Sequence, residues 1–262
     1  MEGSFTQPSP FSGSLVIYPL NLFLLDRRVD SLHLQKDDPR AIHLRKVLRA
    51  KTGDEIDLAV KNGPKGKATL CFSECNSVDL KIRWLKPHKP DYYPITLVVG
   101  VARPQTCRKI LDQASALGVD SLVFFDAEKG EPSYSKSILW SSGEWEKKIK
   151  SGVEQAFASF VPSCSLCSSL KEALSLRNSD GETDLKIALD NYEAEGPLEI
   201  FSSKPKGRIS VCVGTERGWS QKERQILLAH DYQLFHLGPR VLRVETAVVG
   251  CLTMLLSKFW PT

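Results

Sequence analysis

Three short segments directly follow apolar runs that are typical of strands, and the second and third of them are rich in glycine, proline and charged side chains. They are residues 188–192 (Ala-Leu-Asp-Asn-Tyr), 213–220 (Val-Gly-Thr-Glu-Arg-Gly-Trp-Ser) and 237–246 (Leu-Gly-Pro-Arg-Val-Leu-Arg-Val-Glu-Thr). Ligands of open α/β sheets gather beyond the carboxyl ends of the strands. Gly214 and Gly218 would also let a ligand approach the backbone closely. The three segments therefore predict a binding site.

The same segments are compatible with ordinary turns and helix starts. Ser220 with Glu223 three residues later forms a capping box, and the Gly238-Pro239 pair predicts a tight turn. Other signatures argue against common nucleotide and hydrolase sites. Residues 99–103 read Val-Gly-Val-Ala-Arg instead of GxGxxG, which excludes a Rossmann fingerprint there. The sequence has no Walker loop, HExxH or GxSxG motif.

The elements that must position these segments form an alternating pattern in the C-terminal part. Nearly continuous apolar runs predict strands over residues 95–102, 121–125, 185–189, 208–213 and 232–237. Helical spacing predicts helices around residues 110–117, 144–158 and 221–229, and from about 244 onwards. Apolar strands separated by helices indicate a parallel sheet with helices on both faces.

The N-terminal part has a different pattern of apolar residues. Short alternating runs predict strands over residues 15–25, 55–60, 67–72 and 78–84, with one helix over 40–50. This pattern indicates a small β-barrel over residues 15–88. Pro87, Pro90 and Pro94 predict a linker to the α/β domain at 95–262, and the polar, Pro/Ser-rich residues 1–14 predict a flexible tail.

Charge is unevenly distributed along the chain. The formal net charge is +4; residues 1–95 hold 15 basic and 11 acidic residues, whereas residues 96–262 hold 20 of each. The segment 40–51 contains five basic residues and no acid. If it is helical, Arg45 and Arg49 share a face, which would suit an anionic partner. The alternative is an ordinary solvated face.

Cysteine usage and hydropathy restrict the class of protein. The seven cysteines, an odd number, favour a reducing compartment. Cys71/Cys75 and Cys164/Cys167 have metal-ligand spacing, but no His pair accompanies them, so we expect buried thiols and no metal. Residues 15–25 lack the basic start of a signal peptide, and the apolar stretch 244–256 is too short to span a bilayer. We expect a soluble, cytoplasmic protein without a membrane partner.

The second and third segments resemble the signature of the bacterial ribosomal small-subunit RNA (uridine-N3) methyltransferases, a family of the SPOUT superfamily. The resemblance includes Leu-Gly-Val at 117–119, Glu-Gln at 154–155, Val-Pro at 161–162, and residues 43–49 with 52–55. It spans about residues 20–258. The family's second loop usually reads Gly-Pro-Glu-Gly-Gly, where this chain has Thr215 and Arg217.

This resemblance implies an α/β fold whose C-terminal, knotted SPOUT-like parallel sheet follows a PUA-like barrel. It also implies a homodimer, and the strongly apolar last helix has more apolar surface than one face needs, unless its own subunit buries it. The implied cofactor is S-adenosyl-L-methionine. Its implied ligands are Leu189, Val213, Gly214, Gly218, Leu237, Gly238, Pro239, Leu242 and Arg243.

The implied reaction is methylation of N3 of a uridine in small-subunit ribosomal RNA, either free or in the assembled subunit. A base must remove the N3 proton, and the candidate catalytic residues are Arg243, Glu245 and Glu216; Glu245 could instead form an ion pair with Arg243 or Arg240. The candidate RNA-binding residues are His43, Arg45, Lys46 and Arg49. Two alternatives remain: an RNA-binding relative without activity, and a different RNA target such as the ribose 2′-oxygen.

Overall fold

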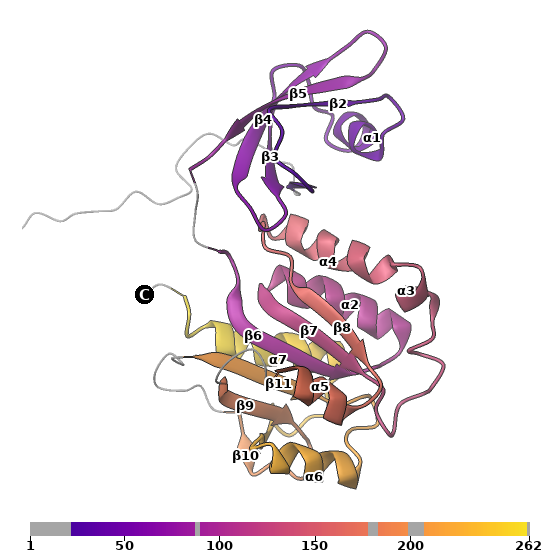
Figure 1. Ribbon diagram of the computed structural model, residues 1–262, viewed down its shortest axis with the longest axis vertical. Coiled ribbons are helices and arrows are strands. Elements are labelled where there is room, and N and C mark those ends of the chain that lie inside the picture. Colours follow the sequence, from indigo (N-terminus) through magenta and orange to yellow (C-terminus); the bar gives the residue numbers. More distant parts are fainter. Residues whose placement is uncertain (1–21, 87–89, 178–182, 199–206, 261–262) are drawn as a thin grey trace, which may run out of the picture.

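The computed structural model describes residues 22–86, 90–177, 183–198 and 207–260. They form two domains, a small one built mainly of strands and a larger α/β domain below it (Figure 1). The division between the predicted barrel and the predicted α/β domain falls in the same region of the chain. The predicted tail 1–14, most of the predicted strand 15–25 and Pro87 of the predicted linker lie outside the described residues.

The small domain is a curled five-stranded sheet with one helix. Its strands are β1 (Phe23–Leu25), β2 (Ser31–Leu34), β3 (Glu55–Val60), β4 (Lys65–Phe72) and β5 (Val78–Trp84), in the order β1-β3-β4-β5-β2. Side chains alternate between buried and exposed along β5, which is why this strand could be predicted. The inward residues pack with Ala41 and Leu44 of helix α1 (Pro39–Lys46).

Helix α1 is shorter than the predicted 40–50. Asp38 caps it by accepting a hydrogen bond from the backbone N–H of Arg40 at 2.8 Å, and Pro39 is its first residue. After Lys46 the chain turns inward, because Leu48 and Ala50 pack against the barrel core. Arg49 therefore lies outside the helix with a φ of 52°. The prediction that Arg45 and Arg49 share a helical face is wrong.

The larger domain contains a seven-stranded sheet in the order β10-β12-β9-β11-β6-β7-β8, and all six pairings are parallel. The strands are β6 (Tyr93–Gly100), β7 (Val119–Phe125), β8 (Ser163–Cys167), β9 (Thr183–Leu189), β10 (Gly196–Pro197), β11 (Arg208–Val213) and β12 (Gln233–His236). The predicted α/β fold with a parallel sheet is confirmed. Strand β8 was not predicted, because its sequence Ser-Cys-Ser-Leu-Cys is largely polar.

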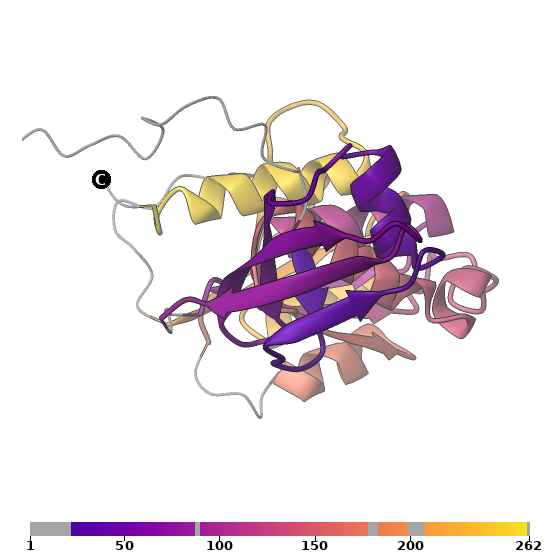
Figure 2. The ribbon, with the colours of Figure 1, turned by 90° about the horizontal axis from the view of Figure 1, so that it is seen from above.

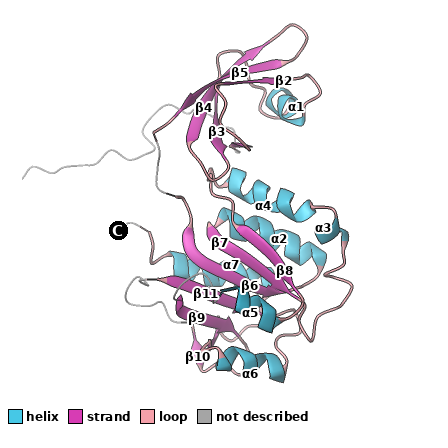
Figure 3. Ribbon diagram, in the orientation of Figure 1, coloured by secondary structure: helices cyan, strands magenta, loops and turns pink. Residues whose placement is uncertain are grey.

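Helices cover both faces of this sheet (Figure 3). The helices α2 (Pro104–Ala116), α3 (Ile138–Ser141), α4 (Glu144–Gln155) and α7 (Val244–Leu256) share one apolar cluster, and α5 (Leu170–Arg177) and α6 (Gln221–Ala229) share another. Figure 2 shows α7 and α5 on opposite sides. Side chains of successive strand residues point to opposite faces of the sheet. Leu97 and Val99 thus belong to the first cluster and Val98 to the second. This double coverage explains the continuous apolar runs of the sequence.

The barrel packs directly on the α/β domain. Asn62, in the turn between β3 and β4, donates its backbone N–H to the carbonyl of Ser159 at 2.8 Å and accepts the N–H of Val161 on Oδ1 at 2.8 Å. Glu154 of α4 accepts the N–H of Leu24 at 3.1 Å. Residues Leu22, Leu24 and Ala59 also belong to the apolar cluster of the α/β sheet. The two domains therefore share a fixed interface.

The cysteines are all free thiols, and they do not all follow the prediction of burial. Cys71 and Cys75 are exposed, which corrects that prediction for this pair. Hydrogen bonds from the hydroxyls of Ser73 and Ser77 lower the pKa of Cys75 to about 7. Within the described ranges, no three His, Cys, Asp or Glu side chains are grouped as metal ligands. None of the helices placed there is long and apolar enough to cross a membrane.

Candidate functional site

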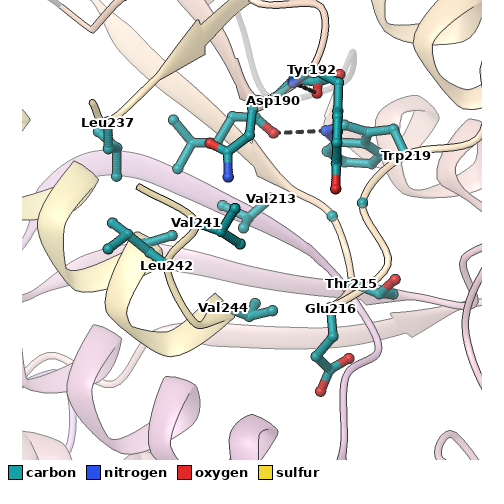
Figure 4. A pocket seen from close by; sticks show the side chains of 15 residues that line it. Asp190, Tyr192, Val213, Thr215, Glu216, Trp219, Leu237, Val241, Leu242 and Val244 are labelled. Carbon is teal, nitrogen blue, oxygen red and sulfur yellow. Dashed lines mark hydrogen bonds between the residues drawn. The ribbon is translucent and has the colours of Figure 1, made fainter. Parts of the chain in front are cut away.

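An open cleft lies at the carboxyl ends of β9 and β11, beside the start of α7 (Figure 4). It is lined by Leu189, Asp190, Asn191, Tyr192, Val213, Gly214, Thr215, Glu216, Gly218, Trp219, Leu237, Val241, Leu242, Val244 and Ala247. In Figure 4, Tyr192 and Trp219 form one wall, and Leu237, Val241 and Leu242 lie on the facing wall. A concave surface with apolar and aromatic side chains and a few polar groups is typical of small-molecule and cofactor sites.

Strand order explains why the three loops meet here. Strand β9 lies between β11 and β12, and its last residue, Leu189, is in register with Val213 on one side and Phe235 on the other. Three neighbouring parallel strands thus end at the same level. The loops that follow them must then surround a common space, as the sequence predicted from their composition.

The structure brings together six of the nine predicted cofactor ligands. Those that line the cleft are Leu189, Val213, Gly214, Gly218, Leu237 and Leu242. The other three, Gly238, Pro239 and Arg243, belong to the same third loop but are not part of the lining. Gly238 has a φ of 101°, a backbone conformation that favours glycine, whereas a Cβ atom there would meet no atom within 4 Å.

The second loop is a tight turn whose two glycines have different structural reasons. Gly218 has a φ of 65° and donates its N–H to the carbonyl of Thr215 at 2.9 Å. A Cβ atom on Gly214 would lie 3.3 Å from the backbone of Gly218. Thr215, which stands where the family usually has proline, accepts the N–H of Arg217 on Oγ1 at 3.3 Å. The turn is therefore closed without that proline.

Helix α6 fixes the second loop through the predicted capping box, which is confirmed. Ser220 Oγ accepts the N–H of Glu223 at 3.0 Å, and Glu223 Oε2 accepts the N–H of Ser220 at 2.8 Å. The other oxygen of Glu223 accepts the N–H of Glu128 at 3.0 Å. This buried carboxylate thus connects the loop after β7 to the loop after β11.

Trp219 is a lining residue that the sequence did not assign to the site. Its indole is buried, and Nε1 donates a hydrogen bond to the carbonyl of Leu189 at 2.8 Å. The ring is parallel to that of Phe125, with centroids 6.0 Å apart. Trp219 therefore connects the first two loops of the cleft. Its position directly after Gly218 was the available signal.

Other unassigned lining residues divide into two kinds. Thr215, Val241, Val244 and Ala247 lie inside the second and third loops and the first turn of α7, so they follow once those loops are placed. Asp190, Asn191 and Tyr192 belong to the first predicted segment, but no individual role was predicted for them. The register of β9 with its neighbours explains why they reach the cleft.

The two candidate bases have different surroundings. Glu216 is exposed, lines the cleft and accepts the N–H of Arg103 on Oε1 at 3.1 Å. Glu245 is buried and pairs with Lys109 of α2, whose Nζ lies 2.9 Å from Oε1. Glu245 therefore forms an ion pair, as the alternative held, but its partner is Lys109 and not Arg243 or Arg240. Arg243 itself is exposed at the start of α7.

Lys109 and burial shift the pKa of Glu245 in opposite directions. Burial raises the pKa of its carboxyl, but hydrogen bonds from Lys109 and from its own backbone N–H lower that pKa by more, so the net shift is downward. Glu245 is thus an anion at neutral pH whose charge is already balanced by Lys109. Of the two candidate bases, Glu216 is the one that lines the cleft.

The four predicted RNA-binding residues lie together on the barrel but differ in availability. The guanidinium of Arg45 donates to the backbone carbonyls of Asn76 and Lys36, so it holds α1 against the β4–β5 turn. His43 is half-buried, and its carbonyl accepts the N–H of Val47 at 3.0 Å. Lys46 and Arg49 are exposed. These last two are the cations of the group best placed to meet an anionic partner.

Known proteins resemble this chain over most of its length. Ribosomal RNA small subunit methyltransferase E 1 of Borreliella burgdorferi is 23% identical over 91% of this chain and 98% of its own length. Ribosomal RNA small subunit methyltransferase E of Treponema pallidum is 27% identical over 84% of this chain and 83% of its own.

Solved structures show the same fold. A ribosomal RNA small subunit methyltransferase E from Neisseria gonorrhoeae, bound to S-adenosyl methionine, superposes with a TM-score of 0.72 at 23% identity, over 90% of this chain and 97% of its own. A methyltransferase from Legionella pneumophila, also with the cofactor bound, gives a TM-score of 0.74 at 20% identity, over 90% and 96%. The chain therefore shares the α/β fold of these methyltransferase structures, in agreement with the fold class predicted from the sequence.

The family model of the RNA methyltransferase domain matches residues 89–256. This range contains the parallel sheet, all three loops of the cleft and the whole of α7. The agreement of sequence family, fold and cleft leads to one conclusion: the chain belongs to the RNA methyltransferase family.

Proposed function

We propose that this protein transfers a methyl group from S-adenosyl-L-methionine to N3 of a uridine in small-subunit ribosomal RNA. The observation that carries the proposal is the cleft formed by three loops at the ends of β9, β11 and β12. Relatives over nearly the whole chain are named small-subunit ribosomal RNA methyltransferases, and similar structures contain the cofactor.

The residues of the cleft suit this cofactor. The walls are mainly apolar or aromatic, which favours the adenine ring, and the backbone around Gly214 and Gly218 is open to a ligand. Leu189, Leu237 and Leu242 would hold the adenosyl group. When bound, the cofactor supplies an activated methyl group on its sulfonium.

The chain's own residues must remove a proton and position the base. The N3–H of uridine is mostly protonated at neutral pH, so a carboxylate beside it increases the rate. We assign this role to Glu216, because it is the candidate base that lines the cleft. Glu245, with its charge balanced by Lys109, attaches the start of α7 to α2. Because N3 takes part in base pairing, the target uridine must be unstacked before it reacts.

The exposed cations at the end of α1 are the proposed phosphate contacts. Lys46 and Arg49 are solvent-exposed on the barrel. Because the barrel is fixed to the α/β domain through Asn62 and Glu154, RNA bound there has a defined orientation relative to the sheet. Arg45 supports this surface through its hydrogen bonds to the carbonyls of Asn76 and Lys36.

A homodimer is also part of the proposal. Most of the apolar side chains of α7 are buried within their own subunit, including Val248, Cys251 and Leu252. The third loop, where Val241 is 79% exposed, offers apolar surface that a partner copy could cover. Light scattering at micromolar concentration tests this point, and a monomeric mass would contradict it.

Calorimetry and a methyl-transfer assay test the main proposal together. The purified protein should bind S-adenosylmethionine without added metal and should label small-subunit ribosomal RNA or assembled small subunits. Mass spectrometry of the digested RNA should detect N3-methyluridine. Cofactor binding without transfer would instead support an RNA-binding relative that lacks activity, and 2′-O-methylated ribose would support the other RNA target.

A further inference from the structure

A buried ion pair lies under the loop that follows β9. The carboxylate of Asp190 is paired with the guanidinium of Arg224 on α6, with Nε 2.5 Å from Oδ2 and Nη2 3.3 Å from Oδ1. Asp190 is 4% exposed and Arg224 is 8% exposed. Burying two charges costs solvation energy that the pair regains only in part, so such a pair is weak evidence for stability alone. Its geometry suggests a positioning role instead.

The same guanidinium holds the loop at a second place. Nη1 of Arg224 lies 3.3 Å from Oε1 of Glu193. Between these two acids, the backbone N–H of Tyr192 donates to Oδ1 of Asp190 at 2.8 Å. Polar contacts at residues 190, 192 and 193 therefore fix the path of the loop. Arg224 reaches all of this from behind, since it is not among the residues that line the cleft.

The residue that these contacts hold is an exposed aromatic one. Tyr192 lines the cleft and yet is 76% exposed. Its ring lies against the turn at Gly218, where an added Cβ atom would be 3.7 Å from Cε2 of the ring. Figure 4 shows the ring beside Trp219, on the wall opposite Val241 and Leu242. An aromatic wall fixed in advance binds a flat ligand with little loss of side-chain freedom.

We propose that Arg224 is a positioning residue for cofactor binding: by holding Asp190 and Glu193, it fixes the ring of Tyr192 as the outer wall against which the adenosyl group binds. The proposal rests on the proposed function, because it takes the cleft to be the site of S-adenosylmethionine. It assigns no contact with the cofactor to Arg224 itself.

The test uses variants that keep the buried charge. Arg224→Lys retains a positive charge for Asp190 but lacks the fork that also reaches Glu193. We expect its Kd for S-adenosylmethionine to rise about tenfold, with KM for the cofactor rising and kcat unchanged. Tyr192→Ala should weaken binding similarly, and Tyr192→Phe should restore it, because the ring is what matters. Lys171→Met, on the exposed side of α5, is the matched control and should bind as the parent does.

Three outcomes overturn the proposal. The first is an Arg224→Lys variant that is folded and binds the cofactor with the parent's affinity. If that variant does not fold, Glu193→Gln is tested in its place, because Glu193 is exposed and its loss leaves Arg224 still paired with Asp190. The second outcome is a Kd for the cofactor that is unchanged in both Glu193→Gln and Tyr192→Ala. The third is unchanged amide exchange of residues 190–193 in Arg224→Lys, measured without cofactor. Failure of the parent to bind S-adenosylmethionine is separate and refutes the proposed function.

Discussion

The two ends of the parallel strands are used in different ways. At the carboxyl ends, α6 and Trp219 hold the loops after β9 and β11, and these two loops and the loop after β12 leave a cleft open. At the amino ends, the segments before β6 and β8 close onto the barrel. Asp91 accepts the N–H groups of Ser159 and Phe160 and pairs with Lys65 of the barrel at 2.7 Å.

This difference shows how one sheet separates chemistry from attachment. Backbone N–H groups at the amino ends are satisfied by Asp91, Asn62 and Glu154. The hollows beside this interface, which Asn62 and Phe160 help to line, lie between the two domains and not among the three loops. At the carboxyl ends, Arg224 and Glu223 stabilise the loops from behind, and the cleft in front has both apolar and polar lining residues. Variants of the cleft should therefore change cofactor binding and catalysis, whereas variants of the domain interface should change stability and the orientation of the barrel.

The largest expected effect is on catalysis. Glu216→Gln removes the carboxylate that lines the cleft, so kcat for methyl transfer should fall by about 10²–10⁴-fold with an unchanged Kd for the cofactor. A single-turnover assay with saturating S-adenosylmethionine measures this step. Glu245→Gln is the comparison variant and should lose less. A larger loss in Glu245→Gln would exchange the roles assigned to the two acids.

The next effect is on cofactor binding. Gly214→Val places a branched side chain 3.3 Å from the backbone of Gly218, which displaces the second loop. We expect binding to fall below detection in calorimetry, a loss of about 100-fold or more, because the turn no longer has its shape. Gly196→Ala is the control, since a Cβ there meets no atom within 4 Å. Normal affinity in Gly214→Val would show that the cofactor binds elsewhere.

The third effect is on RNA binding. Lys46→Ala with Arg49→Ala removes the two exposed cations at the end of α1. Each phosphate contact contributes about 0.7–0.9 to the slope of log affinity against log salt, so the slope should fall by about 1.4–1.8. Cofactor affinity should not change. Arg45→Ala should instead lower the melting temperature, because this guanidinium binds two backbone carbonyls. If the double variant binds RNA as the parent does at every salt concentration, the RNA surface lies on the other domain.

The α/β architecture and the cleft could be predicted from sequence for a physical reason. Strands that are buried on both faces have nearly continuous apolar sequences. The loops after neighbouring parallel strands lie at the same edge of the sheet, so Val213 and Leu237 could be predicted to lie close together. Long-range partners of charged side chains leave no local signal. Lys109 is 136 residues from Glu245, and Arg224 is 34 from Asp190. Arg45 looked available for the same reason, because its carbonyl partners are backbone groups that sequence does not distinguish.

A smaller effect is expected at the domain interface. Asn62→Ala removes the acceptor of the Val161 N–H, a loss of about 1 kcal/mol that should lower the melting temperature by a few degrees. Asn62→Asp keeps the acceptor oxygen and should recover most of the loss. The KM for RNA should rise in Asn62→Ala while the Kd for the cofactor is unchanged. A weaker cofactor affinity would show that the two ends of the strands are coupled.

The smallest effect concerns the buried carboxyl of Glu154 at the same interface. Burial raises its pKa above the ordinary value of 4.5, although the Leu24 N–H and Lys150 act in the opposite direction. Because the folded-state pKa is the higher one, the contribution of this group to stability is fully present below about pH 4.5 and is lost as the pH rises through the folded-state value.

Glu154→Gln can still accept the Leu24 N–H but carries no charge. The melting temperature of the variant relative to the parent should therefore be higher at pH 7 than at pH 4.5. Glu146→Gln, exposed on the same helix, should show no such difference. A pH-independent difference for Glu154→Gln would mean that the interface is hydrated enough for this carboxylate to ionise at no cost.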